Sequence, residues 1–213
     1  SFTCTTKAEI EKALDTFGAP YVVKDDGLAA GKGVVVTEDR EVALTHALAC
    51  KKVVIEEYLK GPEISLFGIS DGKRILAMQP AQDFKRAYDG DLGLNTGGMG
   101  AYSPLPWAPK NIIEQTLEQV LKPTIAAMKE RGTPFVGLLY AGLAMTSKGI
   151  RVIEFNARFG DPETQVLIPR LKTPLAQLLY KAATGDLIDS VLEWRDESAV
   201  TIVLAANGYP ADV

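Results

Sequence analysis

Hydrophobic positions in the first quarter of the chain alternate between helix-like and strand-like spacing. Apolar side chains recur three to four residues apart over Lys7–Phe17, and Gly18 follows, so the spacing predicts a helix that ends there. The apolar runs PYVVK and GVVVT flank a glycine-rich segment and predict an antiparallel hairpin. A second helix is expected over 38–50, and KKVVIEEYL is expected to form a further strand. The residues expected to face inward on the second helix are Val42, Ala43, Ala47 and Leu48.

The rest of the chain has the pattern of long strands joined by tight turns. EISLFGISDGKRILAMQP predicts two strands that turn at Asp71-Gly72, and GLLYAGLAMTSKGIRVIEFNAR predicts a hairpin that turns at Lys148-Gly149. Helical spacing predicts a long helix over 111–131 and another over 174–185. The segment 83–110 has no period and is rich in Gly and Pro, which is typical of a functional loop.

The final stretch, AVTIVLAANGYPADV, predicts a buried strand followed by a turn. No further element follows with which this strand could pair, and the chain does not begin with Met. We therefore expect that additional sequence precedes and follows the printed chain.

Composition and charge narrow the functional classes. The chain has 213 residues, of which 46% are hydrophobic and 23% charged, as in ordinary globular proteins. Its net charge of −4 supplies no general basic field, so sequence-independent binding to nucleic acid is not expected. No run of eighteen apolar residues occurs and the N-terminus lacks the pattern of a signal peptide, so no membrane association is expected.

Few residues are available for thiol, histidine or zinc chemistry. Cys4 and Cys50 lack metal-ligand spacing, and so few cysteines indicate a reducing compartment, which predicts a cytoplasmic protein. His46 is the only histidine and lies inside a predicted helix, so the chain has few residues from which a Ser-His-Asp triad, a Cys-His pair or a zinc site could be built. The aromatic residues of segment 83–110 are not interleaved with basic ones, which disfavours a platform for single-stranded nucleic acid.

KDDGLAAGKGVVV, residues 24–36, has features of a phosphate-binding loop, because backbone N–H groups approach phosphate closely where side chains are absent and lysine tips add positive charge. The candidate contacts are Lys24, Gly31, Lys32 and Gly33. The loop is not a Walker motif, since only three residues separate its first two glycines and Gly33 follows the lysine. A strand rather than a helix follows, which excludes the dinucleotide fingerprint. An ordinary hairpin turn with two solvated lysines explains the pattern equally well.

RVIEFNARFGDPET places Glu154, Asn156 and Arg158 on one face of a predicted strand, with their apolar neighbours facing the core. Carboxylate and amide oxygens are hard ligands that Mg²⁺ accepts when nucleotide phosphates complete its coordination. Asp161 and Glu163 follow at once and add acceptors. The alternative is a half-exposed sheet whose outer face is simply polar.

VVIEEYLKGPE places Glu56 and Glu57 at the end of a strand, and Glu63 after a Gly-Pro turn. Strand ends of this kind can hold an adenine through main-chain groups and a ribose through a carboxylate on its hydroxyls. Each of these acidic residues, taken alone, also fits an ordinary surface.

Five stretches occur in the order found in ATP-grasp enzymes and resemble glycinamide ribonucleotide synthetases. They are KDDGLAAGKGVVV, VVIEEYLKGPEIS, QDFKR, LNTGGMGAYSP and VIEFNARFGDPETQ. The resemblance spans residues 3–213, and NTGGMGAYSP with FNARFGDPETQ is its most specific pair. It implies an α+β ATP-grasp fold, with a lid over 1–58, a larger antiparallel-sheet part over 59–188 and the start of a third domain over 189–213.

The resemblance implies an enzyme of purine biosynthesis that joins glycine to 5-phosphoribosylamine through a glycyl phosphate, with ATP split to ADP and phosphate. Its cofactors would be ATP with Mg²⁺ or Mn²⁺, and the chain is expected to be a cytoplasmic monomer. Phosphoryl transfer requires mainly positioning and charge neutralisation, which agrees with a site that has no histidine or cysteine. The glycine hairpin would act as a lid that keeps water from the acyl phosphate.

The implied site residues follow from matching the motifs position by position. The implied ATP contacts are Lys24, Gly31, Lys32, Gly33, Glu56, Glu57, Tyr58, Leu59, Glu63, Arg86 and Asn95. The implied metal ligands are Glu154 and Asn156. Lys32 and Arg158 are the implied catalytic residues, and the implied contacts of glycine are Arg158, Asp161 and Glu163.

The chain departs from the family pattern in three respects. Asp25 stands where the family usually has Ala and Phe84 where it usually has His, and we expect both to tune the site rather than abolish it. The family's N-terminal domain is absent and its C-terminal domain is cut after the first strand. Two alternatives therefore stay open: a nucleotide-binding module without turnover, and another ATP-grasp carboxylate–amine ligase or a carboxylase.

Overall fold

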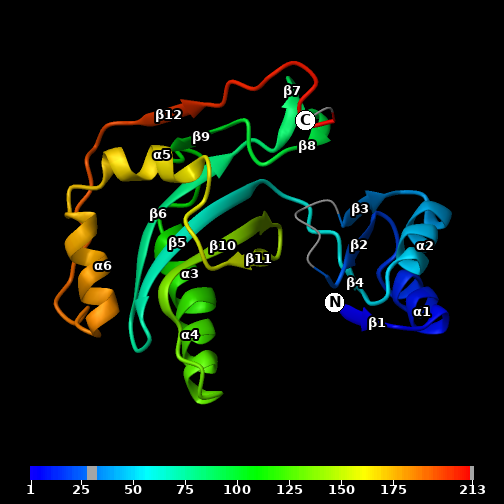
Figure 1. Ribbon diagram of the computed structural model, residues 1–213, viewed down its shortest axis with the longest axis horizontal. Helices are drawn as coiled ribbons and strands as arrows, with labels where there is room; N and C mark the ends of the chain where they lie inside the picture. The colour runs from blue at the N-terminus through cyan, green and yellow to red at the C-terminus, as the bar shows by residue number, and fades with distance from the viewer. Residues whose placement is uncertain (28–32, 212–213) are drawn as a thin grey trace. The chain divides into compact units, whose positions relative to one another are not determined.

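The computed structural model describes residues 1–27 and 33–211, which form two compact units, Ser1–Lys60 and Gly61–Val213 (Figure 1). Each unit has its own sheet and its own core. The predicted division at residues 58 and 188, with a third part over 189–213, stays a prediction.

The first unit is a four-stranded antiparallel sheet with two helices. Its elements are β1 (Phe2–Cys4), α1 (Lys7–Phe17), β2 (Tyr21–Asp25), β3 (Val34–Thr37), α2 (Arg40–Ala49) and β4 (Val53–Glu56). The strand order is β1-β4-β2-β3, and the predicted hairpin of β2 with β3 is confirmed by the pairing of Tyr21 with Thr37 and Lys24 with Val34. Both predicted helices are present.

Local capping explains where the two helices begin. The Thr6 side chain accepts a hydrogen bond from the Glu9 backbone N–H, and the Glu9 carboxylate accepts one from the Thr6 N–H, which completes a capping box. The Asp39 carboxylate caps α2 by accepting a hydrogen bond from the backbone N–H of Glu41. The inward face of α2 consists of the buried Ala43 and Ala47 with the partly buried Leu44. Val42 and Leu48 are each 48% exposed, so the prediction that these two residues face inward is wrong.

The core of the first unit lies between the helices and one face of its sheet. The buried residues of this core are Cys4, Ile10, Ala13, Leu14, Val23, Ala43, Ala47, Val53 and Ile55. Val23 pairs with Ile55, so both point to the helical side, whereas Lys24 and Glu56 alternate with them and point to the opposite face. Both cysteines are free, and burial raises the pKa of the Cys4 and Cys50 thiols, which keeps them protonated and poorly nucleophilic.

The second unit is built on a six-stranded antiparallel sheet of order β11-β10-β5-β6-β9-β12. Its strands are β5 (Glu63–Asp71), β6 (Ile75–Asp83), β7 (Arg86–Tyr88), β8 (Leu92–Asn95), β9 (Gly100–Ser103), β10 (Val136–Thr146), β11 (Gly149–Asn156) and β12 (Ala199–Ile202), of which β7 and β8 form a separate two-stranded ribbon. Its helical elements are α3 (Ile112–Thr116), η1 (Leu117–Leu121), α4 (Lys122–Glu130), α5 (Glu163–Leu167), η2 (Ile168–Arg170) and α6 (Leu175–Thr184). The predicted hairpins at Asp71-Gly72 and Lys148-Gly149 are confirmed.

Helices cover both faces of this sheet, so the unit has three layers and two cores (Figure 1). One core packs Phe67, Met78 and Tyr140 against Val166 of α5 and Leu178 of α6. The other packs the opposite faces of the same strands against Leu121 and Ile125 of the α3–α4 segment. The site described below lies on the first of these faces.

The predicted helix over 111–131 is present but not uniform. Its middle turn, η1, is a π-helix that ends directly before Lys122 and Pro123. Proline lacks the N–H that would bond four residues back, and its ring collides with that carbonyl, so a widened turn before Pro123 lets the helix continue.

Two expectations about the secondary structure of the remaining segments are wrong. Segment 83–110 was expected to be a loop without strands, but it contains the short strands β7, β8 and β9, which are too short and too rich in glycine to show a period. The strand expected to be buried near the C-terminus is β12, an edge strand of which Val200 is 71% and Ile202 74% exposed. Its other residues, Ala199 and Thr201, face inward.

Among the residues that the structure describes, no helix is both long and apolar enough to cross a membrane.

Candidate active site

The register of the second unit's sheet places Glu154 and Asn156 on the face covered by α5. Gly142 of β10 pairs with Glu154 on one side and with Ser65 on the other. Tyr140 pairs in the same way with Asn156 and Phe67. Residues directly opposite each other in a sheet point to the same face, so both predicted ligands share the face of Ser65 and Tyr140.

Glu154 and Asn156 are adjacent in space, and the Asn156 side-chain amide donates to Glu154 Oε1 at 3.1 Å. The expectation that Ile153, Phe155 and Ala157 face the core is wrong for Phe155, which is 42% exposed, and for Ala157, which is also exposed, whereas Ile153 is half-buried. β11 is an edge strand, and its register shifts opposite Gly142, where the ladder moves from Glu154 to Val152. This bulge interrupts the alternation between Val152 and Glu154 but leaves the alternation of Glu154, Phe155 and Asn156 intact.

Gly142 leaves space for the Glu154 side chain. A Cβ atom at this position would lie 3.2 Å from Glu154 Cγ, which is tighter than an ordinary contact. The glycine therefore lets the carboxylate lie across β10 toward the middle of the sheet.

These two side chains have the donor set of a magnesium–nucleotide site. One oxygen of the Glu154 carboxylate and the Asn156 amide oxygen have no hydrogen-bond partner among the described residues. Nowhere in residues 1–27 and 33–211 do three or more Asp, Glu, His or Cys side chains gather in a way that could hold a metal alone. Mg²⁺ is commonly bound by one or two protein oxygens plus substrate phosphates and waters, so the residues present fit Mg²⁺ only when a nucleotide shares it.

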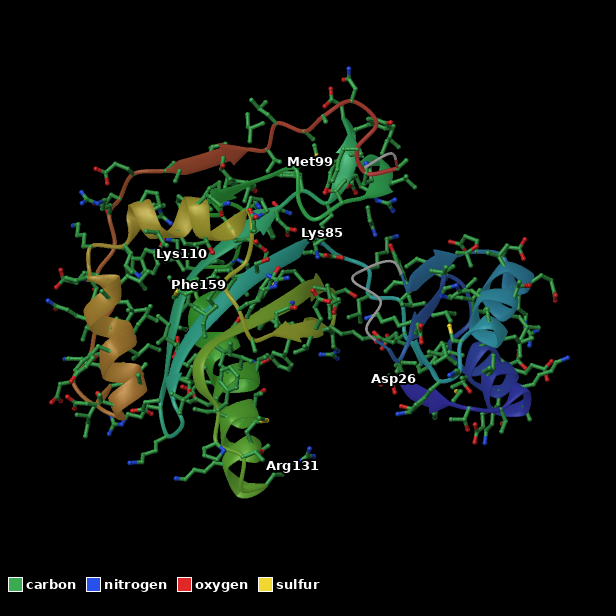
Figure 2. All side chains as sticks on the ribbon, in the orientation of Figure 1. Asp26, Lys85, Met99, Lys110, Arg131 and Phe159 are labelled. Atoms are coloured by element: carbon green, nitrogen blue, oxygen red, sulfur yellow. The ribbon has the colours of Figure 1, made fainter. Side chains whose placement is uncertain are left out.

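Two charged residues that the sequence analysis did not single out, Asp83 and Lys85, lie with Glu63 in a charged cluster at the same end of the sheet. Glu63 is the first residue of β5, Asp83 is the last of β6, and Lys85 follows it, with its Nζ 3.6 Å from a Glu63 carboxylate oxygen. Asp83 and Lys85 both belong to the QDFKR stretch. Two charged residues alternating at the end of an apolar strand were the pattern that could have identified them. Figure 2 labels Lys85 at this end of the unit.

Asp83 and Lys85 are partly buried, and this burial shapes the electrostatics of the cluster. Burial raises the pKa of Asp83 to about 6, assisted by Glu163 and Glu63 and opposed by Lys85. Burial opposes the charge on Lys85, but the carboxylates around it, above all Asp83 and Glu63, raise its pKa. The cluster therefore combines one firmly held cation with carboxylates that repel one another, which favours a ligand carrying positive charge.

Glu163 lies inside the protein. It is 2% exposed, and its Oε1 accepts hydrogen bonds from the Tyr140 hydroxyl at 2.6 Å and the Ser65 hydroxyl at 2.8 Å. Burial and the Glu163 carboxylate together raise the pKa of Tyr140, which keeps the phenol protonated as a donor. Gly160 makes room for this carboxylate, since a Cβ there would lie 2.4 Å from Glu163 Oε2.

The other residues expected near glycine are exposed. Among the described residues, the Arg158 guanidinium donates to the carbonyl oxygen of the next residue, Phe159, at 3.1 Å. Asp161 accepts from the Gln165 side chain at 2.6 Å. Both residues lie in the segment that follows β11, which ends at Asn156.

Arg86 and Asn95 face each other across the β7–β8 ribbon. Their Cα atoms are register partners, and the Arg86 guanidinium donates to the Gly93 carbonyl at 2.8 Å. Arg86 is exposed, so its remaining donors can reach a ligand.

The most specific motifs of the sequence meet in this unit. Gly98 has a φ of 127°, and a Cβ there would lie 2.4 Å from Pro162 Cδ, so NTGGMG and FGDPE pack with no space for a side chain. The Thr96 backbone N–H and hydroxyl both donate to the Lys85 carbonyl, at 2.7 and 2.9 Å. Three stretches that are separate in the sequence thus form one cluster around the strand ends.

The first unit carries the remaining predicted residues. The Lys24 ammonium lies 3.0 Å from the Glu56 carboxylate, and both side chains are 23% exposed. Gly33 accepts hydrogen bonds through its carbonyl from the Asp25 N–H at 2.8 Å and from His46 Nε2 at 3.2 Å. Gly31 and Lys32 lie outside the described residues. Glu57, Tyr58 and Leu59 follow the end of β4, shorter than the predicted strand, and the Tyr58 ring is 43% exposed.

Protein stability should depend on Asp83 between about pH 4 and pH 7. The pKa of Asp83 in the folded protein, about 6, lies above its ordinary value of 3.8, so the stability it contributes is complete below the ordinary value and is lost as pH rises through 6. Asp83→Asn has no such titration. We expect the free energy of unfolding of this variant, relative to that of the wild type, to increase by about 1–2 kcal/mol between about pH 4 and pH 7.5.

Urea unfolding of both proteins at the two pH values measures this difference. Asp89→Asn is the matched control, since Asp89 is exposed. A wild-type-to-variant difference in unfolding free energy that is equal at both pH values would contradict the expectation.

Known proteins resemble this chain over nearly its whole length. The sequence profile of the family described as "phosphoribosylglycinamide synthetase, ATP-grasp (A) domain" matches residues 1–164. The phosphoribosylamine–glycine ligase of Streptomyces coelicolor is 65% identical over 211 residues, which cover 99% of this chain and 51% of that protein. The corresponding ligase of Leifsonia xyli is 58% identical, with 96% and 50% covered.

Solved structures agree with the predicted fold. The phosphoribosylamine–glycine ligase of Thermotoga maritima matches with a TM-score of 0.89 and 32% identity, covering 98% of this chain and 55% of that one. The N5-carboxyaminoimidazole synthetase of Staphylococcus aureus matches in fold alone, with a TM-score of 0.69 and 20% identity, covering 95% and 51%. The predicted α+β ATP-grasp fold is therefore confirmed.

The chain spans about half the length of the curated relatives it matches. The family profile covers more than half of the chain, and the motifs named above lie within or directly beside the matched residues. This chain belongs to the phosphoribosylglycinamide synthetase ATP-grasp (A) domain family.

Proposed function

We propose that this chain is the ATP-grasp part of an enzyme that joins glycine to 5-phosphoribosylamine, with ATP split to ADP and phosphate through a glycyl phosphate, acting as a cytoplasmic monomer. The observation that carries the proposal is the pair of Glu154 and Asn156, held 3.1 Å apart at the strand ends where the family's motifs meet. The curated relatives bear the name phosphoribosylamine–glycine ligase.

The protein's contribution to phosphoryl transfer would be positioning and charge neutralisation. In our proposal Glu154 and Asn156 hold a divalent cation, Mg²⁺ or Mn²⁺, through their oxygens. When bound, the cation supplies Lewis-acid neutralisation of the triphosphate charge. A structure with the same fold, from Hydrogenobacter thermophilus 2-oxoglutarate carboxylase, contains MgADP, which supports the use of an adenine nucleotide.

The residues of the first unit would bind other parts of ATP. Lys24 and the backbone N–H groups of Gly31, Lys32 and Gly33 would contact phosphates, because glycine allows close approach and lysine adds charge. The strand end at Glu56, with Glu57, Tyr58 and Leu59, would hold the adenine.

The remaining contacts would come from the second unit. Glu63 would accept from the ribose hydroxyls, and Arg86 with Asn95 would meet phosphate or metal. Arg158 would pair with the glycine carboxylate as it becomes the acyl phosphate. Asp161 is exposed, which supports a position for it beside the bound glycine. Glu163 already accepts hydrogen bonds from Ser65 and Tyr140, so it would act on glycine by anchoring the segment that carries Asp161 rather than by direct contact.

Release of ADP that requires both substrates tests the proposal. We expect this chain to release ADP from Mg-ATP when glycine and 5-phosphoribosylamine are both present, and at a rate at least about tenfold lower when either is omitted, because the acyl phosphate must form and then be captured. A coupled assay for ADP measures the rate. Replacing glycine by bicarbonate is the control for a carboxylase.

Each other result identifies an alternative. Calorimetric binding of Mg-ATP without substrate-dependent ADP release would make this chain a nucleotide-binding module. ADP release driven by bicarbonate would place it with the carboxylases. Absence of Mg-ATP binding would overturn the proposal as a whole.

A further inference from the structure

The second unit contains an open groove at the turn end of the β5–β6 hairpin. Its volume is about 460 Å³, within the range of small-molecule sites. Its walls come from the hairpin turn and first residues of β6, from α4, and from the segment after α6. The lining residues used below are Lys73, Arg74, Ile75, Lys122, Ile125, Lys129 and Ile188.

The groove is far from the candidate active site. Glu63 begins the nine-residue strand β5 and Asp71 ends it, and the eight steps between them, at about 3.3 Å each, separate the two ends by about 26 Å. Figure 2 labels Lys85 and Arg131, the residue after α4, at opposite ends of this unit. No residue that lines the groove belongs to the nucleotide or metal contacts proposed above.

The charged residues of the groove are all basic. Four cationic side chains line it and no acidic one does, although acidic residues outnumber basic ones in the whole chain by 27 to 23. The lining thus concentrates positive charge in a protein of net charge −4.

Asp71, the acid in the hairpin turn beside the groove, is held by backbone donors. Asp71 is 7% exposed, and its carboxylate accepts from the backbone N–H groups of Lys73, Arg74 and Leu187, at 2.9, 2.7 and 3.3 Å. Burial alone would raise the pKa of Asp71, but these backbone donors outweigh it and lower the pKa, so the carboxylate stays ionised inside the turn.

Two of the four cations are already engaged. The Arg74 guanidinium donates to the Ile188 carbonyl at 3.1 Å, which fixes one wall, and Lys122 pairs with Glu118 one helical turn away. Lys73 and Lys129 are exposed, and neither makes an ion pair with any described side chain. Lys73 in the hairpin turn and Lys129 on α4 therefore present two ammonium groups to the groove.

The floor of the groove is apolar. Ile75 and Ile125 are 5% exposed and belong to the core, while Ile188 is 57% exposed at the rim. An apolar floor below cationic walls matches a molecule with an apolar body and an anionic end, because the floor removes apolar surface from water and the ammonium groups bind the charge.

We propose that this groove binds a small organic phosphate or carboxylate with an apolar or aromatic body. Lys73 and Lys129 contact the anionic group, and the side chains of Ile75, Ile125 and Ile188 contact the body. The site is independent of the nucleotide site.

Calorimetric titration with 1-naphthyl phosphate tests the proposal on the whole chain. We expect saturable binding at one site, weakened by added salt because the charge contacts are screened. Inorganic phosphate, which lacks the body, and 1-naphthol, which lacks the charge, should each bind at least about tenfold more weakly. Excess Mg-ATP should not displace the probe.

Charge reversal locates the site. The double variant Lys73→Glu with Lys129→Glu should weaken binding of 1-naphthyl phosphate by at least about tenfold. The control carries the same charge change at two exposed lysines outside the groove, Lys110→Glu with Lys172→Glu, and should bind like the wild type. Equal affinity in the two double variants, displacement by Mg-ATP, or no saturable binding by the wild type would overturn the proposal.

Discussion

Replacing Glu154 with alanine should weaken Mg-ATP binding to this chain by about 100-fold or more, with the fold unchanged. Residues that merely orient a metal ligand already contribute about 10–100-fold to metal affinity, and Glu154 would be a ligand itself. Its side chain is exposed and lies over Gly142, so its removal leaves no cavity in either core of the second unit. Calorimetric titration of Mg-ATP, with the melting temperature recorded alongside, measures both effects.

Glu130→Ala is the matched control for this experiment. Glu130 is an exposed carboxylate at the end of α4, where no nucleotide contact is proposed. A second variant, Asn156→Asp, keeps an oxygen ligand and should retain more affinity than Glu154→Ala. Identical isotherms for Glu154→Ala and Glu130→Ala would remove the metal assignment.

Replacing Arg170 with methionine should lower the free energy of unfolding by about 3 kcal/mol, because it leaves a hydroxyl and two carbonyls without their donor and each unsatisfied buried polar group costs about 1–3 kcal/mol. Arg170 is 4% exposed. Its guanidinium donates to Ser103 Oγ at 2.6 Å and to the carbonyls of Glu197 and Arg195, at 2.7 and 3.4 Å. Burial lowers the pKa of Arg170, but it remains a cation at neutral pH.

The effect should be concentrated in the segment before β12. Glu197 and Arg195 have few other ties to the sheet, so hydrogen exchange should accelerate over 195–203 more than over β5. Arg131→Met is the control, since Arg131 is exposed and should change stability by less than about 0.5 kcal/mol. Urea unfolding with equal free energies for the two variants would show that the Arg170 contacts contribute nothing to stability.

Features set by local chemistry were predictable from the sequence. Helix α1 has its cap, its apolar stripe and its terminating glycine within a few residues, and its bounds are those predicted. The β5–β6 hairpin follows from two apolar strands around Asp71-Gly72. The pairing of Glu154 with Asn156 on one face required only the period of a strand.

Features that depend on neighbours elsewhere in the chain were not predictable. Phe155 on β11 and Val200 on β12 are exposed because both strands lie at the edges of the six-stranded sheet. The pKa of Asp83 depends on Glu63 and Glu163, which are brought close only by strand register and by helix α5. A hydrophobic pattern reports that a segment is a strand, but not which of its faces is covered.

The packing of Gly98 on Pro162 has a practical consequence for protein engineering. A loop exchange that transplants residues 94–100 from a distant homologue would bring a backbone shaped for a different partner segment. Such chimaeras should be assembled with residues 158–163 from the same donor, because the two stretches behave as one interchangeable cassette.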